Sequence, residues 1–172
     1  MRNSFINHYE TRVREGATVA GKALFVCANR YIAYDFYKIV TELRPEWAEK
    51  KICSDDVILD DKDKKELKPM EKIKLVMTRN KDDEKDLFDM LGTKDDRKEF
   101  DRQFKNPKSN FKIAIVVDMW LTGFDVPELD TIYIDKPIQQ HTLIQTISRV
   151  NRVCEGKDKG LIVDYIGIKK NM

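Results

Sequence analysis

Five short apolar runs rich in β-branched residues constrain the fold of this chain more than any other feature of its sequence. They are Ala23–Cys27, Ile73–Thr78, Ile113–Asp118, Thr131–Asp135 and Leu161–Asp164. Runs of this length and composition are typical of buried strands. Most are separated by segments with helical spacing, notably Tyr31–Leu43, Lys94–Phe104 and Thr142–Val153. The alternation predicts an α/β fold with a mainly parallel sheet and helices on both faces.

Two charged stretches interrupt this alternation. Ser54–Met70 is dense in Asp and Lys and is expected to be a solvated loop, with the only nearby strand signal around Lys51–Cys53. Asn80–Asp86 is expected at the surface, leading into a short helix that Gly92 ends. Because neither stretch resembles a linker, residues 1–172 are predicted to form a single domain.

Composition limits the classes of function. Lys and Arg number 32 against 30 Asp and Glu, so any nucleic-acid contact must come from local patches. Cys27, Cys53 and Cys154 lack zinc or disulfide spacing, and His8 and His141 are isolated, so no metal site is predicted. No apolar run approaches the roughly 18–20 residues that span a bilayer, and no signal-peptide core appears, which favours a cytoplasmic protein.

The segment Gly16–Ala23 matches the phosphate-loop pattern G-x-x-x-x-G-K at every position but the last. There Ala23 replaces the Ser or Thr whose hydroxyl holds magnesium. A phosphate loop also leaves a strand and opens a helix, whereas here a predicted strand follows at once. The segment is therefore interpreted as a glycine-containing turn from an N-terminal helix into the first strand.

The predicted helix Thr142–Val153 carries two arginines on one face. Helical spacing places Leu143, Ile147 and Val150 on one stripe, and it places Gln145, Arg149 and Arg152 on the opposite side. The guanidinium fork matches phosphate oxygens, so the second face is a candidate clamp for a terminal phosphoryl group. A solvated face that pairs with nearby carboxylates is the alternative.

The loop Leu121–Pro127 adds to this candidate site. It follows the predicted strand Ile113–Asp118 and combines a flexible glycine with a hydroxyl and a carboxylate, so it could approach a ribose or a phosphate closely. In open parallel sheets, ligands bind beyond the carboxyl ends of the strands. The loops that follow strands are therefore the expected place for a site.

At this point the sequence resembles the second RecA-like domain of superfamily 2 helicases and translocases. Gln145–Arg152 looks like motif VI of that superfamily, Q-x-x-G-R-x-G-R, with Ser148 and Asn151 in place of the two glycines. Asp118–Asp125 looks like motif V, with its glycine and aspartate two residues apart. Ala23–Arg30 resembles motif IV.

More narrowly, three segments resemble the motor subunit of type I restriction enzymes, in which the two glycine positions of motif VI are also occupied by other residues. These segments are Asp118–Pro127, the motif VI helix with the following Asn151–Val153, and Gly160–Gly167. The resemblance covers nearly the whole chain and is weakest in Ser54–Met70. It implies that the chain is a RecA-like, helicase C-terminal-type domain cut out of a longer polypeptide.

The resemblance also implies roles for particular residues. Arg152 would be the arginine finger, with Arg149 beside it, in an ATP cleft whose Walker motifs and Mg²⁺-ATP belong to an absent first RecA-like domain. The other ATP contacts would come from Gly123, Asp125 and Gln145, and contacts to the backbone of double-stranded DNA would come from Asn29, Arg30, Thr78 and Thr122.

The same resemblance implies partners and limits. The parent chain would contain a nuclease domain and assemble with methyltransferase and specificity subunits into a site-specific deoxyribonuclease that translocates DNA. The fragment alone would be an inactive monomer without a bound cofactor. The alternatives are another superfamily 2 helicase, or a non-catalytic α/β module whose arginines hold a phosphate or a protein carboxylate.

Overall fold

The computed structural model describes residues 2–120, 125–151, 157 and 160–166, and the side chain of Arg149 lies outside that description. The described elements follow one another as α1 (Arg2–Arg14), β1 (Lys22–Cys27), α2 (Arg30–Leu43), the 3₁₀ helix η1 (Pro45–Ala48), α3 (Asp61–Glu66), β2 (Ile73–Leu75), α4 (Lys85–Leu91), α5 (Lys94–Lys105), β3 (Ile113–Val116), β4 (Leu129–Asp135), α6 (Gln140–Val150) and β5 (Leu161–Asp164).

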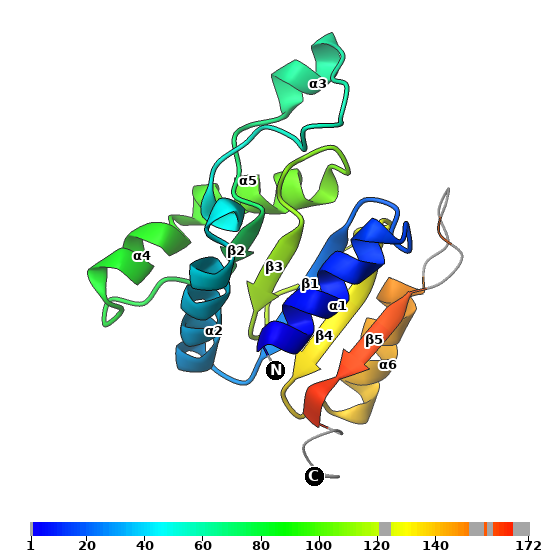
Figure 1. Cartoon of the computed structure of the whole chain (residues 1–172). Coiled ribbons are helices and arrows are strands. Elements are labelled where there is room, and N and C mark those ends of the chain that lie inside the picture. Colours follow the sequence, from blue (N-terminus) through cyan, green and yellow to red (C-terminus); the bar gives the residue numbers. More distant parts are fainter. Residues whose placement is uncertain (1, 121–124, 152–156, 158–159, 167–172) are drawn as a thin grey trace.

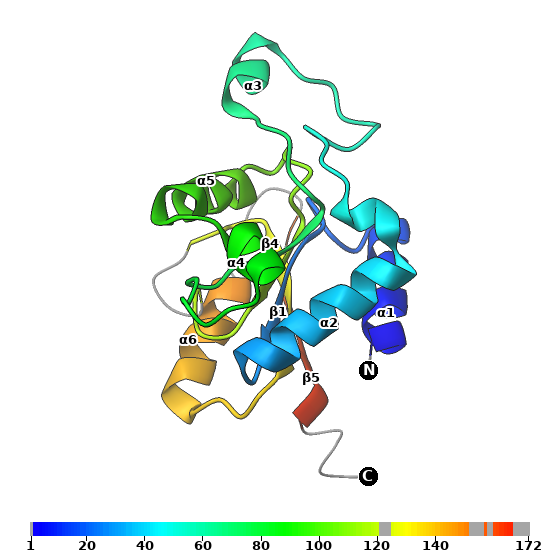
Figure 2. The ribbon, with the colours of Figure 1, turned by 90° about the vertical axis from the view of Figure 1, so that its left-hand side faces the viewer.

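The five strands form one sheet in the order β2-β3-β1-β4-β5, and every pairing in it is parallel (Figure 1). Helices α1 and α2 cover one face, and α5 and α6 cover the other (Figure 2). This arrangement confirms the predicted α/β class. The central strand β1 is buried at every position, as expected for a strand covered on both faces.

The face under α1 and α2 is packed with aromatic rings. Phe25 of β1 is fully buried and stacks on Phe36 of α2, with ring centroids 3.9 Å apart. Phe5 of α1 meets Phe25 edge-on at 5.1 Å and Tyr133 of β4 at 4.8 Å. Edge-to-face and offset-stacked pairs are the favoured aromatic geometries, so these contacts fix both helices on the sheet.

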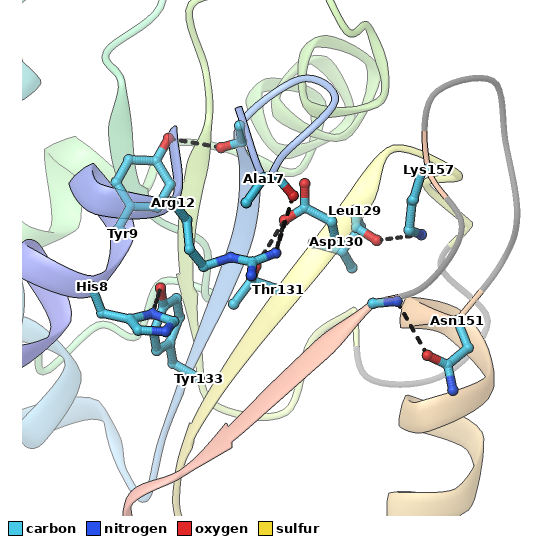
Figure 3. Close-up of polar contacts among 12 residues, drawn as sticks. His8, Tyr9, Arg12, Ala17, Leu129, Asp130, Thr131, Tyr133, Asn151 and Lys157 are labelled. Carbon is cyan, nitrogen blue, oxygen red and sulfur yellow. Dashed lines mark hydrogen bonds and ion pairs between the residues drawn. The ribbon is translucent and has the colours of Figure 1, made fainter. Parts of the chain in front are cut away.

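Polar contacts at the rim also hold α1 to the sheet (Figure 3). The Tyr9 hydroxyl donates to the carbonyl of Gly21 at 2.7 Å, and Nδ1 of His8 lies 2.7 Å from the Tyr133 hydroxyl. Nη2 of Arg12 lies 3.9 Å from Oδ1 of the buried Asp130. Helix α1 is therefore an integral layer of the fold.

The interpretation of Gly16–Ala23 as a turn is confirmed. Helix α1 ends before it and β1 begins at Lys22, with Gly16 and Gly21 at φ of 71° and 69°. The Lys22 side chain is fully buried, and its Nζ donates to the carbonyl of Phe111 at 2.5 Å. Because this ammonium is enclosed by the core, it has no access to a nucleotide phosphate.

The expectation that Ser54–Met70 is only a loop was wrong in one part. Helix α3 lies within it, and Asp60 and Asp63 cap its first turn reciprocally through their side chains and backbone N–H groups. Nζ of Lys108 lies 2.5 Å from Oδ2 of Asp63 and adds an ion pair. The strand signal at Lys51–Cys53 corresponds to one antiparallel bridge between Lys51 and Met70, and the chain bends at Ile52 and Cys53.

Helix α4 ends as predicted at Gly92, which has a φ of 72°. A Cβ at this position would lie 2.8 Å from Cβ of Asp96, so both the left-handed conformation and the space require glycine. In the described part of the chain, no helix combines the length and apolar character that crossing a bilayer requires.

Candidate nucleotide and nucleic-acid interface

Three residues predicted to face DNA lie at the carboxyl edge of β1 and β2. Arg30, at the start of α2, donates from Nη1 to the carbonyl of Thr78 at 2.7 Å. The Asn29 side chain caps α2 by accepting from the amide of Ile32 at 2.9 Å. Asn29 and Thr78 are exposed and Arg30 is half-buried. The sheet thus places polar groups from distant parts of the sequence on one surface.

Asp83 organises this edge, a role that sequence reasoning missed. Its carboxylate accepts from Nη2 of Arg30 at 2.6 Å and 2.5 Å and from the backbone amide of Asn80 at 2.7 Å. The Asp83 side chain is 8% exposed, so the pair with Arg30 is shielded from solvent. In the sequence, Asn80–Asp86 looks like a solvated charged run, because the partner of Asp83 is Arg30, which lies 53 positions earlier.

A second set of polar contacts links the segment after β4 to the segment after β3, the two strands that flank β1 in the sheet. Nζ of Lys136, just after β4, donates to the carbonyl of Val117 at 2.9 Å and to Oδ1 of Asp118 at 2.7 Å, both just after β3.

Trp120 follows with a φ of 67°, a left-handed conformation that is costly for a bulky residue. Its ring stacks on Phe104 with centroids 5.2 Å apart, which offsets part of that cost.

The loop that resembles motif V is described only in part. Thr122 and Gly123 lie outside the described residues. Asp125 is exposed and is followed by the buried Val126, which anchors the chain on the face covered by α5 and α6.

Helix α6 carries residues 145–150 of the segment that resembles motif VI. Gln145 is exposed on it, whereas Thr146 and Val150 are each 1% exposed. The hydroxyl of Thr146 donates to the carbonyl of Thr142 at 2.8 Å, which allows a polar residue on the packed face. Arg149 lies within α6, but its side chain and all of Arg152 lie outside the described residues.

Two expectations about this helix need correction. Ile147, assigned to the packed stripe with Leu143 and Val150, is 37% exposed because Thr146 points at the sheet in its place. Helix α6 ends at Val150 and not at Val153, since Asn151 already lies in a turn.

Asn151 stands where the superfamily motif has glycine, and its side chain ties α6 to the last strand. Its Oδ1 accepts from the backbone amide of Gly160 at 3.2 Å, just before β5 (Figure 3). Nearby, Nζ of the buried Lys157 donates to the carbonyls of Pro127 and Leu129 at 2.9 Å and 2.7 Å. These contacts hold the end of α6 next to β5 and the start of β4.

The close approach of Gly160 to Val150 leaves no space for a side chain at position 160, and this requirement for glycine can be tested. A Cβ on Gly160 would lie 2.1 Å from Cγ1 and 2.2 Å from the carbonyl oxygen of Val150. We expect Gly160→Ala to lower the free energy of unfolding by about 3 kcal/mol, because backbone atoms cannot rotate out of the way. Chemical denaturation of the chain, followed by circular dichroism, measures this change.

Gly16→Ala is the matched control for that variant. Unlike Gly160, Gly16 has a left-handed φ of 71°, but a Cβ there meets nothing within 4 Å, so we expect a cost of only about 1 kcal/mol. Equal costs for the two variants would show that the contact with Val150 does not constrain position 160.

Among the residues that the structure describes, no three His, Cys, Asp or Glu side chains are grouped so that they could hold a metal ion. The described candidate residues lie in three places: Asn29, Arg30 and Thr78 at the carboxyl edge, Asp125 in the loop before β4, and Gln145 on the exposed side of α6. The structure therefore gives a surface of polar groups on a parallel sheet, without a complete nucleotide pocket of its own among those residues.

Comparison with solved structures defines the class of this fold. The C-terminal domain of a Dbp5 variant from S. cerevisiae, solved bound to Gle1 and IP6, matches with a TM-score of 0.50 at 15% sequence identity. The alignment covers 91% of this chain and 66% of that chain. The chain therefore has a RecA-like fold, like that domain.

Sequence comparison defines the family. The model described as type I restriction enzyme subunit R domain 3 matches residues 19–167, and the chain belongs to this family. It is 36% identical over 171 residues to the HindI endonuclease subunit of Haemophilus influenzae, and 39% identical over 168 residues to the putative MjaIXP endonuclease subunit of Methanocaldococcus jannaschii. These alignments cover 98% and 97% of this chain but only 14% of each relative.

Proposed function

We propose that this chain is the second RecA-like motor domain of an ATP-dependent double-stranded DNA translocase within a type I restriction enzyme. One observation carries the proposal: the family match spans residues 19–167, and helix α6 within it presents the segment that resembles motif VI. Because the relatives are restriction endonuclease subunits, the family favours this function over another superfamily 2 helicase or a non-catalytic module.

The ATP site is proposed to form between this chain and a domain elsewhere in the full-length subunit. That domain would hold Mg²⁺-ATP with its own Walker motifs, while Arg152 and Arg149 would meet the negative charge that develops on the transferred phosphoryl group. Gln145, Gly123 and Asp125 would contact the nucleotide or orient the arginines. The exposure of Gln145 and Asp125 supports this arrangement, since both can be reached from outside the sheet.

The DNA contacts are proposed for the carboxyl edge, with Asn29, Arg30, Thr78 and Thr122 facing the backbone. The hydrogen bond from Arg30 to Thr78 supports this, because it holds one cation and one hydroxyl-bearing residue at the same exposed edge. Changes in the ATP cleft during turnover would alter the affinity of this edge for the duplex.

The remaining proposals concern the whole enzyme. The chain spans about one seventh of the relatives that it matches, so a nuclease domain would lie in another part of the same subunit. Methyltransferase and specificity subunits would be its partners, and the cytoplasm, where a restriction enzyme meets incoming DNA, its location.

The proposal predicts that ATP hydrolysis requires more than this chain. We expect the isolated chain to show no ATPase activity above background, and the full-length subunit in its complex to hydrolyse ATP only when long duplex DNA is present. A steady-state phosphate-release assay with and without DNA measures both. Micromolar ATP binding by the isolated chain would instead favour a stand-alone nucleotide-binding module, since half a cleft should bind nucleotide poorly.

A further inference from the structure

Two lysines meet at the amino ends of β2 and β3, the opposite end of these strands from Arg30 and Thr78. Lys72 and Lys112 each come directly before a strand. Their backbones are neighbours, because the amide of Lys112 donates to the carbonyl of Lys72 at 2.9 Å. Both side chains line one cavity of about 360 Å³, which α1 and the turn 18–21 also border.

Neither ammonium has a carboxylate partner. Among the described residues, no Asp or Glu oxygen lies within 4.0 Å of either Nζ atom. Nζ of Lys112 donates to the carbonyl of Pro107 at 2.9 Å, and that of Lys72 lies 5.0 Å from the Trp47 ring centroid. These neutral partners orient the ammonium groups without neutralising them.

Lys112 is shielded from water, and Lys72 is partly buried. Lys112 is only 8% exposed. Burial lowers the pKa of Lys72, against the raising effect of the carboxylates of Glu10 and Glu46, and burial together with the nearby Lys72 lowers the pKa of Lys112 to about 8. With a pKa of about 8, Lys112 remains mainly charged at pH 7, at an energetic cost that a nearby anion would reduce.

The rest of the cavity wall suits an anion with several oxygen atoms. Thr18 and Ser54 contribute hydroxyl groups, which can donate to such oxygens. Asp56 is the acidic residue of the lining; it is exposed, and it raises the pKa of Lys112 from a distance beyond that of an ion pair. Within the lining, two lysines therefore stand against one carboxylate, while Glu10 and Glu46, which raise the pKa of Lys72, lie outside the lining.

We propose that this cavity binds a compact oxyanion of the phosphate class, held by the ammonium groups of Lys72 and Lys112. Among the described residues, the buried Lys112 ammonium has only the neutral carbonyl of Pro107 as a hydrogen-bond partner, whereas an anion in contact with both lysines would form charge-assisted hydrogen bonds. The site is independent of the proposed ATP cleft and DNA edge, and it gives the domain a separate ligand.

Titration of the isotopically labelled chain with inorganic phosphate at pH 7 tests this inference. Sodium chloride of equal ionic strength is the baseline, and the backbone amide resonances of Gly21 and Val57, which line the cavity, are the readout. We expect saturable shifts with phosphate and none with chloride. Lys112→Met and Lys72→Met should each weaken binding by at least about tenfold, as expected for loss of a charge-assisted contact.

Two further variants distinguish this site from general attraction of anions. Asp56→Asn should tighten phosphate binding, since it removes the negative charge at the rim. Lys62→Met is the matched control because this lysine is 80% exposed on α3, so its loss should leave the affinity unchanged. If Lys112→Met fails to fold, Lys72→Met and Asp56→Asn still give opposite expected changes. Absence of saturable shifts, equal shifts with chloride, or no response to Lys72→Met and Asp56→Asn would overturn the inference.

Discussion

Replacing Arg152 with alanine in the full-length subunit is expected to lower DNA-stimulated ATP turnover by about 10³-fold or more while ATP binding is retained. An arginine finger contributes roughly 10³–10⁵ in rate because it meets charge that develops only in the transition state. Ground-state affinity should therefore change little. Steady-state hydrolysis, together with equilibrium binding of a labelled nucleotide, separates the two effects.

Arg102→Ala is the matched control for this experiment. Arg102 is an exposed arginine on α5 that pairs with Glu99 one helical turn away, so its loss should leave turnover within about twofold of the parent. If Arg152→Ala also retained turnover, Arg149 and Arg152 would have no catalytic role, and the motor assignment would rest on family membership alone.

Replacing Phe25 with alanine is expected to lower the free energy of unfolding by about 3–5 kcal/mol, which is the usual cost of truncating a buried aromatic residue. The Phe25 ring is fully buried at the centre of the sheet, stacked on Phe36 and in edge contact with Phe5. Its loss would leave a cavity beneath both α1 and α2. Equilibrium denaturation with urea measures the change.

The control for the core variant is Tyr31→Ala. Tyr31 lies near the start of α2 and is 82% exposed, so we expect a change of no more than about 0.5 kcal/mol. A small effect of Phe25→Ala would mean that α1 and α2 are held to the sheet mainly by the polar contacts at its rim.

The sheet could be predicted from sequence because its signal is local. Each strand is a short apolar run, as expected for burial on both faces, and its length and β-branched composition distinguish it from a buried helix. Strand ends were less predictable: β2 ends at Leu75, although the apolar run continues to Thr78, because only three of its residues pair with β3. Helix α3 was missed since its signal is a capping box of two aspartates within a charged run.

Residues of the candidate site could be predicted from sequence only where they come after a predicted strand. Asn29, Arg30 and Thr78 were expected at the carboxyl edge because parallel strands bring their ends together, and the structure places them there. Asp83 and Asn151 could not be assigned, since their partners lie 53 and 9 positions away and only the folded chain brings them into contact. The lysine cavity was equally hidden, because strand pairing alone makes Lys72 and Lys112 neighbours.

The pairing of Arg30 with Asp83 has a consequence for how this domain would respond to ionic strength. DNA affinity falls with added salt in proportion to the number of condensed counterions that protein cations displace from the phosphates. An arginine that is already neutralised by a shielded carboxylate displaces less than a full counterion. If Arg30 contacts the duplex as proposed, it would position the backbone while adding little to the salt sensitivity of binding.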